Sequence, residues 1–223
     1  MTSELGERYN AVLARAKAAA SGRVFSLIAV SKGQSVDQIE QLYRLGQRDF
    51  GENYAQELTE KARELSLRGC TELRWHFIGH LQTNKVKSLI GIVTTVHSVD
   101  SLRLAEEISK RASLAPVSIF LEVNIDLEPS KSGLAPLESR ATAEAVSRLL
   151  GIELQGLMGI PEPGTDQGTR AFEALKVLEL ECQPYTRGSL SMGMSGDFEQ
   201  ALAAGATHIR VGTSIFGARQ PKA

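Results

Sequence analysis

The first candidate for chemistry is a lysine at the end of an apolar run near the start of the chain. The run at residues 27–30 reads Leu-Ile-Ala-Val, and Ser31 and Lys32 follow it. In one interpretation the side chain of Lys32 simply reaches solvent at the rim of the fold. In the other, burial and a neighbouring cation disfavour the charged ammonium and leave a free amine, which can form a Schiff base with an aldehyde.

A second group of polar residues predicts an anion-binding site late in the chain. Ser195 fits the N-cap of a helix, and Gly212 and Thr213 directly follow a β-rich run. Unpaired amides at a helix N-terminus bind anions, and a glycine lets the backbone approach a ligand closely. The amides of Gly212 and Thr213, with the hydroxyls of Ser195 and Thr213, would encircle a phosphate. The alternative is that Ser195 does no more than cap its helix.

Arg210 lies inside the β-rich run that ends just before Gly212. An arginine that points into a core needs a partner, because charged side chains are almost never fully buried unless they are paired. One interpretation is an internal ion pair with a carboxylate. In the other, the guanidinium contacts the body of the same ligand whose phosphate the following turn would hold.

Asn53 and His76 are weaker candidates beside two further β-rich runs. Asn53 either donates a hydrogen bond to a ligand or caps the helix predicted to begin at Tyr54. His76 is more typical of a satisfied histidine in a core or at a rim than of a catalytic one. Apolar packing is the expected role of three methionines, Met158, Met192 and Met194.

Segments of β and α character alternate along the whole chain and must position these residues. The β-rich runs lie at residues 25–30, 48–50, 72–78, 92–97, 117–123, 152–157, 189–191 and 207–211. The helical patterns lie at residues 4–20, 35–45, 54–67, 84–89, 137–150, 171–180 and 197–203, with one more after Ser101. This alternation predicts a parallel sheet, and its eight repeats predict an α/β fold, a closed (β/α)8 TIM barrel with an extra N-terminal helix.

A barrel would bring the candidate residues together at one end. Ligands of TIM barrels bind at the carboxyl ends of the strands, and phosphates bind after strands 7 and 8. The predicted strand ends carry Lys32, Asn53, Ser195, Arg210 and Gly212. No linker interrupts the alternation, so we expect a single domain over residues 1–223. The alternative is a Rossmann-like open sheet, but this sequence has no G-x-G-x-x-G motif after the first predicted strand.

The composition excludes several classes of function. The chain has 223 residues, its 25 Lys and Arg balance 26 Asp and Glu, and aromatic residues make up only 5%. A nucleic-acid binder needs a basic patch and often stacking aromatics. The two cysteines form no metal-ligand spacing with the histidines, and there is no signal peptide or apolar run of about 18 residues. We therefore expect a cytoplasmic protein without metal, nucleic-acid or membrane partners and, for want of a sustained apolar stripe, a monomer.

Eight short segments are distinctive in combination. They are residues 29–32, 50–54, 75–79, 81–85, 131–133, 156–158, 190–195 and 210–217. Together they resemble the YggS/PROSC family, the pyridoxal phosphate homeostasis proteins, and they are spread over nearly the whole chain. The resemblance implies a single (β/α)8 barrel like the N-terminal domain of alanine racemase.

The resemblance also implies a site for pyridoxal 5'-phosphate (PLP). Lys32 would form an internal aldimine with the cofactor, with Asn53 near the ring and Arg210 at the pyridine nitrogen. An arginine there stays protonated, disfavours a pyridinium and weakens the ring as an electron sink. The phosphate would be held by Met194, Ser195, Gly212 and Thr213.

One loop departs from the family pattern. The family usually has a threonine after the lysine and a proline two places later, whereas this chain has Gly33, Gln34 and Ser35. We expect a looser loop behind Lys32 and altered exchange of the cofactor, with the amine itself retained.

The resemblance favours a non-catalytic PLP-binding protein that buffers or delivers the cofactor, with PLP-dependent apoenzymes as its partners. The alternative is a PLP-dependent enzyme, such as an amino-acid racemase with weak activity. The related two-domain racemases take a second proton-transfer group from another domain and subunit. We expect no second domain here, so only Tyr54 or His76 could substitute. A weaker alternative is a barrel enzyme that uses Lys32 as an aldolase-type amine on a phosphorylated metabolite.

Overall fold

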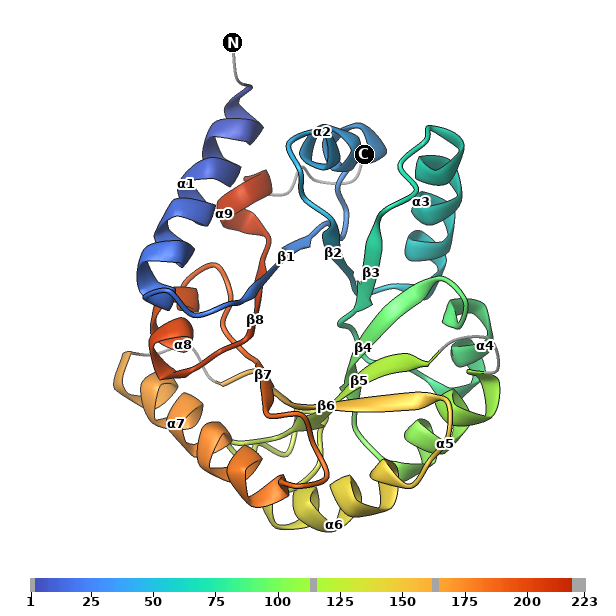
Figure 1. Ribbon diagram of the computed structural model, residues 1–223, viewed down its shortest axis with the longest axis vertical. Helices are drawn as coiled ribbons and strands as arrows, with labels where there is room; N and C mark the ends of the chain where they lie inside the picture. Colours follow the sequence, from blue (N-terminus) through green and yellow to red (C-terminus); the bar gives the residue numbers. More distant parts are fainter. Residues whose placement is uncertain (1–2, 113–115, 162–164, 218–223) are drawn as a thin grey trace.

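Eight parallel strands close into a barrel, as Figure 1 shows. The computed structural model describes residues 3–112, 116–161 and 165–217, so the ends of the predicted domain lie outside the described residues. The strands are β1 (Ser26–Val30), β2 (Asp49–Glu52), β3 (Arg74–Phe77), β4 (Val93–Val99), β5 (Val117–Val123), β6 (Ile152–Gly159), β7 (Ser189–Ser191) and β8 (His208–Val211). Each strand pairs with the next and β1 pairs with β8, which confirms the predicted α/β TIM barrel.

Helices surround the barrel on the outside (Figure 1). They are α1 (Glu4–Ala20), α2 (Val36–Arg44), α3 (Ala55–Leu67), the short 3-10 helix η1 (Thr83–Lys85), α4 (Val86–Leu89), α5 (Leu102–Arg111), α6 (Pro136–Ser147), α7 (Thr165–Cys182), α8 (Phe198–Ala204) and α9 (Thr213–Phe216). The predicted extra N-terminal helix is α1. The turn expected after the last strand is instead the short helix α9. In the part of the chain that the structure describes, no helix is long and apolar enough to cross a membrane.

The two faces of the sheet differ in polarity. On β5, alternate residues from Val117 to Val123 belong to the hydrophobic core between the sheet and the helices. Phe120, between them in sequence, is buried but lies outside this core. Because side chains alternate between the faces of a strand, Phe120 points into the barrel. The same alternation places His76 and Arg210 inside, where barrels of this type usually carry branched aliphatic residues. The interior of this barrel is therefore unusually polar.

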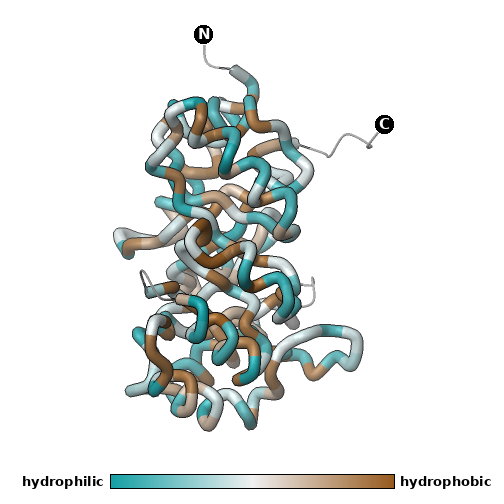
Figure 2. The backbone as a smooth tube through the Cα atoms, turned by 90° about the vertical axis from the view of Figure 1, so that its right-hand side faces the viewer, coloured by the Kyte–Doolittle hydropathy of each residue, from teal (hydrophilic) through white to brown (hydrophobic). Residues whose placement is uncertain are grey.

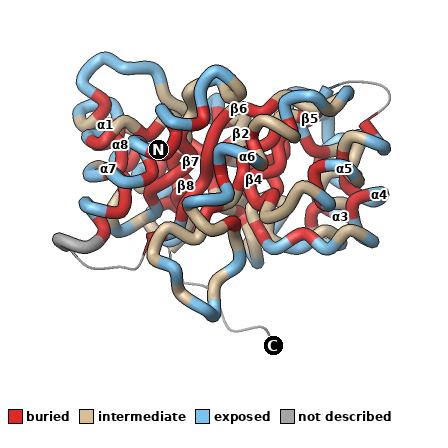
Figure 3. The backbone as a smooth tube through the Cα atoms, turned by 90° about the horizontal axis from the view of Figure 1, so that it is seen from below, coloured by how far each residue is buried: buried red, intermediate tan, exposed pale blue. Residues whose placement is uncertain are grey.

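Burial follows the same division between sheet and helices. Figure 3 shows that the strands are buried, whereas the helices are exposed on their outer sides. Along the outer helices hydrophobic and hydrophilic residues alternate, as Figure 2 shows. This pattern is that of amphipathic helices whose apolar faces cover the sheet.

The N-terminal helix holds the turn after β8. Arg8 on α1 donates from Nε to the carbonyl oxygen of Ile215 at 2.8 Å and from Nη2 to that of Phe216 at 3.3 Å. These carbonyls end α9, and a cation at the C-terminus of a helix is favourable. Figure 1 shows α1 and α9 side by side. The extra helix therefore fixes the short helix that begins just after Gly212.

The register between the first and last strands sets the geometry of the barrel mouth. Ile28 on β1 lies opposite Arg210 on β8, and Ala29 lies opposite Val211. Both strands run in the same direction, so the turns that follow them leave the barrel at the same edge. The two turns after β1 and β8 are therefore neighbours.

We predict that Gly156→Ala destabilises the barrel. A Cβ at this position of β6 would lie 1.8 Å from the carbonyl oxygen of Ser189 on β7. Relief of this overlap requires the paired strands to separate, so the free energy of unfolding should fall by about 2–3 kcal/mol. The matched control is Gly196→Ala, because nothing lies within 4 Å of the Cβ that it would add. Urea unfolding measures both variants, and equal stability would contradict the prediction.

Candidate functional site

Ser195 and the start of α9 form a cluster of polar groups, here called the Ser195 cluster, between β7 and β8. The hydroxyl of Ser195 accepts hydrogen bonds from the backbone N–H groups of Gly212 at 3.2 Å and of Ser214 at 3.4 Å. The predicted capping of the nearby helix is wrong, because α8 begins at Phe198 with Asp197 as its N-cap residue. Ser195 instead caps α9 by satisfying amides that a helix leaves unpaired at its start.

Met194 and Thr213, also predicted for the phosphate, lie in the same cluster. The backbone N–H of Met194 donates to Oδ1 of Asp197 at 2.5 Å, and Thr213 is the exposed first residue of α9. The predicted apolar packing holds for Met158 and Met192, which are buried, but not for Met194, which is 37% exposed. Amides and hydroxyls thus converge after β7 and β8 in an arrangement that can bind an anion.

The guanidinium of Arg210 is buried inside the barrel. Its Nη1 donates to Oγ of Ser191 at 2.6 Å, and its Nη2 donates to the carbonyl oxygen of Gly159 at 3.1 Å. Within residues 3–112, 116–161 and 165–217 no carboxylate forms an ion pair with it, so the alternative of an internal ion pair is wrong. Burial lowers the pKa of Arg210 to about 10, and the charges of Glu122 and Asp197 oppose the shift. The group is protonated at neutral pH.

Lys32 is half-buried in a tight turn after β1. The N–H of Gln34 donates to the carbonyl oxygen of Ser31 at 2.9 Å, and Gly33 has a φ of +71°. A positive φ at the third position is the type II geometry that favours glycine. The N–H of Gly33 also donates to Oε1 of Glu57 on α3 at 2.6 Å. Hydrogen bonds thus hold this turn within itself and to α3, and the altered exchange of the cofactor stays a prediction.

An ion cluster of Glu52, Glu57 and Lys61, here called the Lys61 cluster, lies behind the turn, with Glu52 and Lys61 buried and Glu57 half-buried. Nζ of Lys61 donates to Oε1 of Glu52 at 2.8 Å and to Oε1 of Glu57 at 2.6 Å. It also donates to the carbonyl oxygen of Ser31 at 2.7 Å, and the hydroxyl of Ser31 donates to Oε1 of Glu52 at 2.7 Å. The cluster therefore ties β2 and α3 to the turn that carries Lys32.

The sequence predictions missed the Lys61 cluster, although a signal for it is present. Lys61 lies between Leu58 and Leu65 on the face of α3 that the apolar spacing predicts to be buried. A charge on such a face needs a partner. Burial raises the pKa of Glu52, and the charge of Lys61 opposes the shift. Oε2 of Glu52 is buried and has no hydrogen-bond partner among the described residues.

Asn53 lies at the end of β2 with an unsatisfied acceptor. Its Oδ1 is buried and finds no hydrogen-bond partner in the described part of the chain. The predicted cap is wrong, because Tyr54 is the N-cap residue of α3 and makes no side-chain cap bond. A Cβ on Gly79 would lie 2.2 Å from the carbonyl oxygen of Asn53, so only glycine lets the end of β3 approach this closely. A buried acceptor of this kind can receive a hydrogen bond from a ligand.

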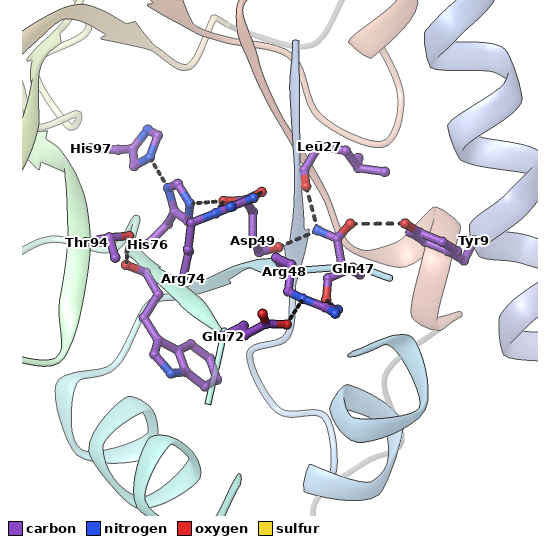
Figure 4. Close-up of polar contacts among 11 residues, drawn as sticks. Tyr9, Leu27, Gln47, Arg48, Asp49, Glu72, Arg74, His76, Thr94 and His97 are labelled. Carbon is purple, nitrogen blue, oxygen red and sulfur yellow. Dashed lines mark hydrogen bonds and ion pairs between the residues drawn. The ribbon is translucent and has the colours of Figure 1, made fainter. Parts of the chain in front are cut away.

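His76 is enclosed in the barrel interior. Its Nε2 lies 2.9 Å from Oδ1 of Asp49, and its Nδ1 lies 2.9 Å from Nε2 of His97, as Figure 4 shows. Both ring nitrogens are used within the protein, as expected for a satisfied core histidine. Burial acts against ionisation of Asp49, but the hydrogen bonds of Arg74 and His76 outweigh it and hold the pKa of Asp49 well below its usual value.

A cavity of about 700 Å³ opens beside Asn53. It lies between the segments after β2 and β3, and its wall includes Tyr54, Phe77, His80 and Lys85. The side chain of Tyr54 is 65% exposed. A ligand held at Asn53 would have this open space on one side.

The fold belongs to a known class of barrels. Residues 8–220 match the family model described as the alanine racemase N-terminal domain. An alanine racemase of Clostridium difficile superposes with a TM-score of 0.77, over 97% of this chain and 58% of the racemase. Its identity is 15%, so this likeness shows the fold alone. The class is thus the alanine racemase N-terminal type of (β/α)8 barrel.

Proteins of higher identity define the family within that class. The pyridoxal phosphate homeostasis protein of Pseudomonas aeruginosa is 42% identical over 97% of this chain and 96% of its own. The Escherichia coli protein of that name is 40% identical over 87% and 86%. The structure of PipY from Synechococcus elongatus with PLP bound has a TM-score of 0.85 at 35% identity, over 96% of this chain and 100% of that chain. This chain therefore belongs to the family of pyridoxal phosphate homeostasis proteins, as its motifs predicted.

We predict that Lys61→Met lowers the free energy of unfolding by about 3–5 kcal/mol, because Glu52 is left buried without its cation. Burial already raises the pKa of Glu52, and loss of Lys61 raises it further. A carboxyl group whose folded pKa exceeds its unfolded one destabilises the fold increasingly as the pH rises above the unfolded value. The loss should therefore be larger at pH 8 than at pH 5.

Urea unfolding at the two pH values measures this loss. The matched control is Lys61→Met combined with Glu52→Gln, which removes the unpaired charge and should remove the pH dependence. An equal loss at both pH values in the single variant would show that the ion pair with Glu52 is not its cause.

Proposed function

We propose that this protein binds PLP and serves in PLP homeostasis as a non-catalytic carrier that buffers or delivers the cofactor. The observation that carries the proposal is the convergence of an amine, an anion-binding turn and a buried guanidinium at one end of the barrel. Lys32 follows β1, Arg210 lies on the adjacent β8, and the Ser195 cluster joins the ends of β7 and β8. The binding of PLP by the structurally similar PipY supports the proposal.

The residues at the mouth fit the parts of the cofactor. PLP supplies, when bound, an aldehyde that condenses with an amine and a pyridine ring that can withdraw electrons. Lys32 would hold the aldehyde carbon covalently. Asn53, whose buried Oδ1 has no partner among the described residues, would bond to the ring hydroxyl. The phosphate would be bound by Met194, Ser195, Gly212 and Thr213.

Arg210 would set the electronic character of the ring. A guanidinium can only donate hydrogen bonds, so beside the pyridine nitrogen it supplies a donor and disfavours protonation of that nitrogen. An unprotonated ring withdraws electrons poorly. That character suits storage of the cofactor better than transformation of amino acids, and it supports the carrier over the enzyme.

The carrier role implies partners and a setting. PLP-dependent apoenzymes would receive the cofactor, and the protein would act in the cytoplasm as a monomer. Residues 1–223 would form one domain, since the strands and helices of the described residues belong to a single barrel. Nucleic acid and membranes have no place in the proposed role.

Weak catalysis, such as amino-acid racemisation, is the alternative. It needs a second acid or base on the face of the cofactor opposite Lys32. His76 uses both ring nitrogens inside the barrel. Tyr54 is the residue that favours the alternative, because it follows Asn53 directly and is 65% exposed.

Lys32→Ala should abolish covalent capture of PLP. Wild-type protein mixed with PLP and reduced with borohydride should carry the cofactor on a peptide that contains Lys32, which mass spectrometry identifies. The variant should carry only background label. The control is Lys87→Ala, which removes an exposed lysine on α4 and should leave the adduct unchanged. Labelling of the Lys32→Ala variant at the wild-type level would overturn the proposed site. The absence of labelling in the wild type would overturn it as well.

Incubation with single enantiomers of amino acids separates the carrier from the enzyme. We expect less than one product per protein molecule, because His76 is engaged inside the barrel and the ring would be a poor electron sink. Chiral chromatography measures the product. Multiple turnovers that disappear in both Lys32→Ala and Tyr54→Phe would establish the racemase alternative instead.

A further inference from the structure

A continuous chain of hydrogen bonds, here called the relay, runs through the barrel interior from Arg210 to Asp49. Nη1 of Arg210 lies 2.6 Å from Oγ of Ser191, which lies 2.8 Å from Nδ1 of His97. Nε2 of His97 lies 2.9 Å from Nδ1 of His76, whose Nε2 lies 2.9 Å from Oδ1 of Asp49. Figure 4 shows the half of the relay from His97 to Asp49.

The relay crosses the barrel between two ends of opposite charge. Arg210, Ser191, His97 and His76 are each at most 4% exposed. At the other end, Asp49 opens strand β2 and accepts two hydrogen bonds from Arg74, at 2.7 Å and 2.6 Å. The relay thus links Arg210 through hydrogen-bonded side chains to a carboxylate whose own cation is Arg74. Aligned hydrogen bonds in a low-dielectric interior polarise one another, which strengthens such a chain.

The chemistry of the two ends sets the direction of the first and last hydrogen bonds of the relay. A guanidinium only donates, so Ser191 accepts from Arg210, and an ionised carboxylate only accepts, so Asp49 accepts from His76. A neutral imidazole has one donor and one acceptor nitrogen. A His76 ring of that form, which donates to Asp49 from Nε2, accepts at Nδ1 from Nε2–H of His97.

The remaining hydrogen bond joins His97 and Ser191. Burial lowers the pKa of His97 well below its usual value, so the ring is neutral. With its proton on Nε2, the ring accepts the hydroxyl proton of Ser191 at Nδ1. This bond turns the lone pairs of the Ser191 oxygen towards Arg210.

We propose, on the basis of the PLP site proposed above, that His97 is a positioning residue that orients the Ser191 hydroxyl and thereby holds Arg210 at the pyridine nitrogen. Without His97 the hydroxyl is free to rotate, and the guanidinium loses one of its two fixed acceptors. The pyridine nitrogen of the cofactor would then face a guanidinium donor that is held less firmly in place. His97 acts in this way without touching the cofactor.

His208 provides a matched control in the same part of the barrel. The ring of His97 stacks on Phe120 at 4.6 Å between centroids, and the ring of His208 meets Phe120 edge-on at 4.9 Å. Nδ1 of His208 lies 2.8 Å from Oγ1 of Thr207, outside the relay. A phenylalanine at either histidine keeps an aromatic ring, but only His97→Phe breaks the relay.

The first test compares absorption and fluorescence spectra of the PLP-loaded variants. His97→Phe and Ser191→Ala should shift the visible band in the same direction as Arg210→Gln, while His208→Phe should keep the wild-type band. All four should retain the borohydride-trapped adduct on Lys32. A wild-type spectrum for both His97→Phe and Ser191→Ala would overturn the proposal, as would an equal shift in His208→Phe. Ser191→Ala removes only one oxygen atom, so it is the smaller of the two changes. If His97→Phe does not fold, the spectrum of Ser191→Ala decides the test.

The second test needs no cofactor. In ¹⁵N-histidine-labelled protein without PLP, NMR should show both His76 and His97 protonated at Nε2 and unprotonated at Nδ1 near neutral pH. A proton on Nδ1 of either ring would overturn the direction of the relay. If PLP fails to bind while the tautomers are as expected, the proposed function is wrong but the relay is supported. If PLP binds to Lys32 and the tautomers differ, only the relay is wrong.

Discussion

A guanidinium buried in a barrel interior is the constraint to which much of this structure responds. Removal of a charge from water is costly unless hydrogen bonds and an opposite charge compensate it. Arg210 has no paired carboxylate among the residues described, and it donates instead to Ser191 and Gly159. The charges of Glu122 and Asp197 favour the cation, and Ser191 connects it through two histidines to Asp49, whose own cation is Arg74. The polar interior of the barrel follows, because aliphatic layers would leave the cation without acceptors.

Two contacts on the outside of the barrel hold the turns that face this interior. Arg8 satisfies the last carbonyls of α9, and the Lys61 cluster binds the backbone beside Lys32. Each contact links a helix on the outer surface to a turn at a strand end. The two turns proposed to bind opposite ends of the cofactor are therefore fixed by separate, buried or half-buried charges.

The barrel could be predicted because its signal is local. Strand β5 has the predicted bounds, Val117–Val123, whereas β6 extends to Gly159, two residues past its predicted end. The role of Ser195 could not be predicted in the same way. Its sequence fits a nearby N-cap, but its hydroxyl is bonded to the amide of Gly212, 17 residues away. Lys61 could be predicted only in part. Its spacing between apolar residues of α3 indicates that it is buried, but it does not identify its partners.

The sequence by itself determined the alternation of strands and helices, the family, and the placing of Lys32 and Arg210 at or near strand ends. Only the tertiary structure decided what these side chains contact: the hydrogen-bonded turn at Lys32, and the chain of hydrogen-bonded side chains that leads from Arg210 towards Asp49. The physical reason is that periodic burial depends on neighbouring residues, whereas a buried polar group takes its partner from whatever distant strand the closed barrel brings within hydrogen-bond distance.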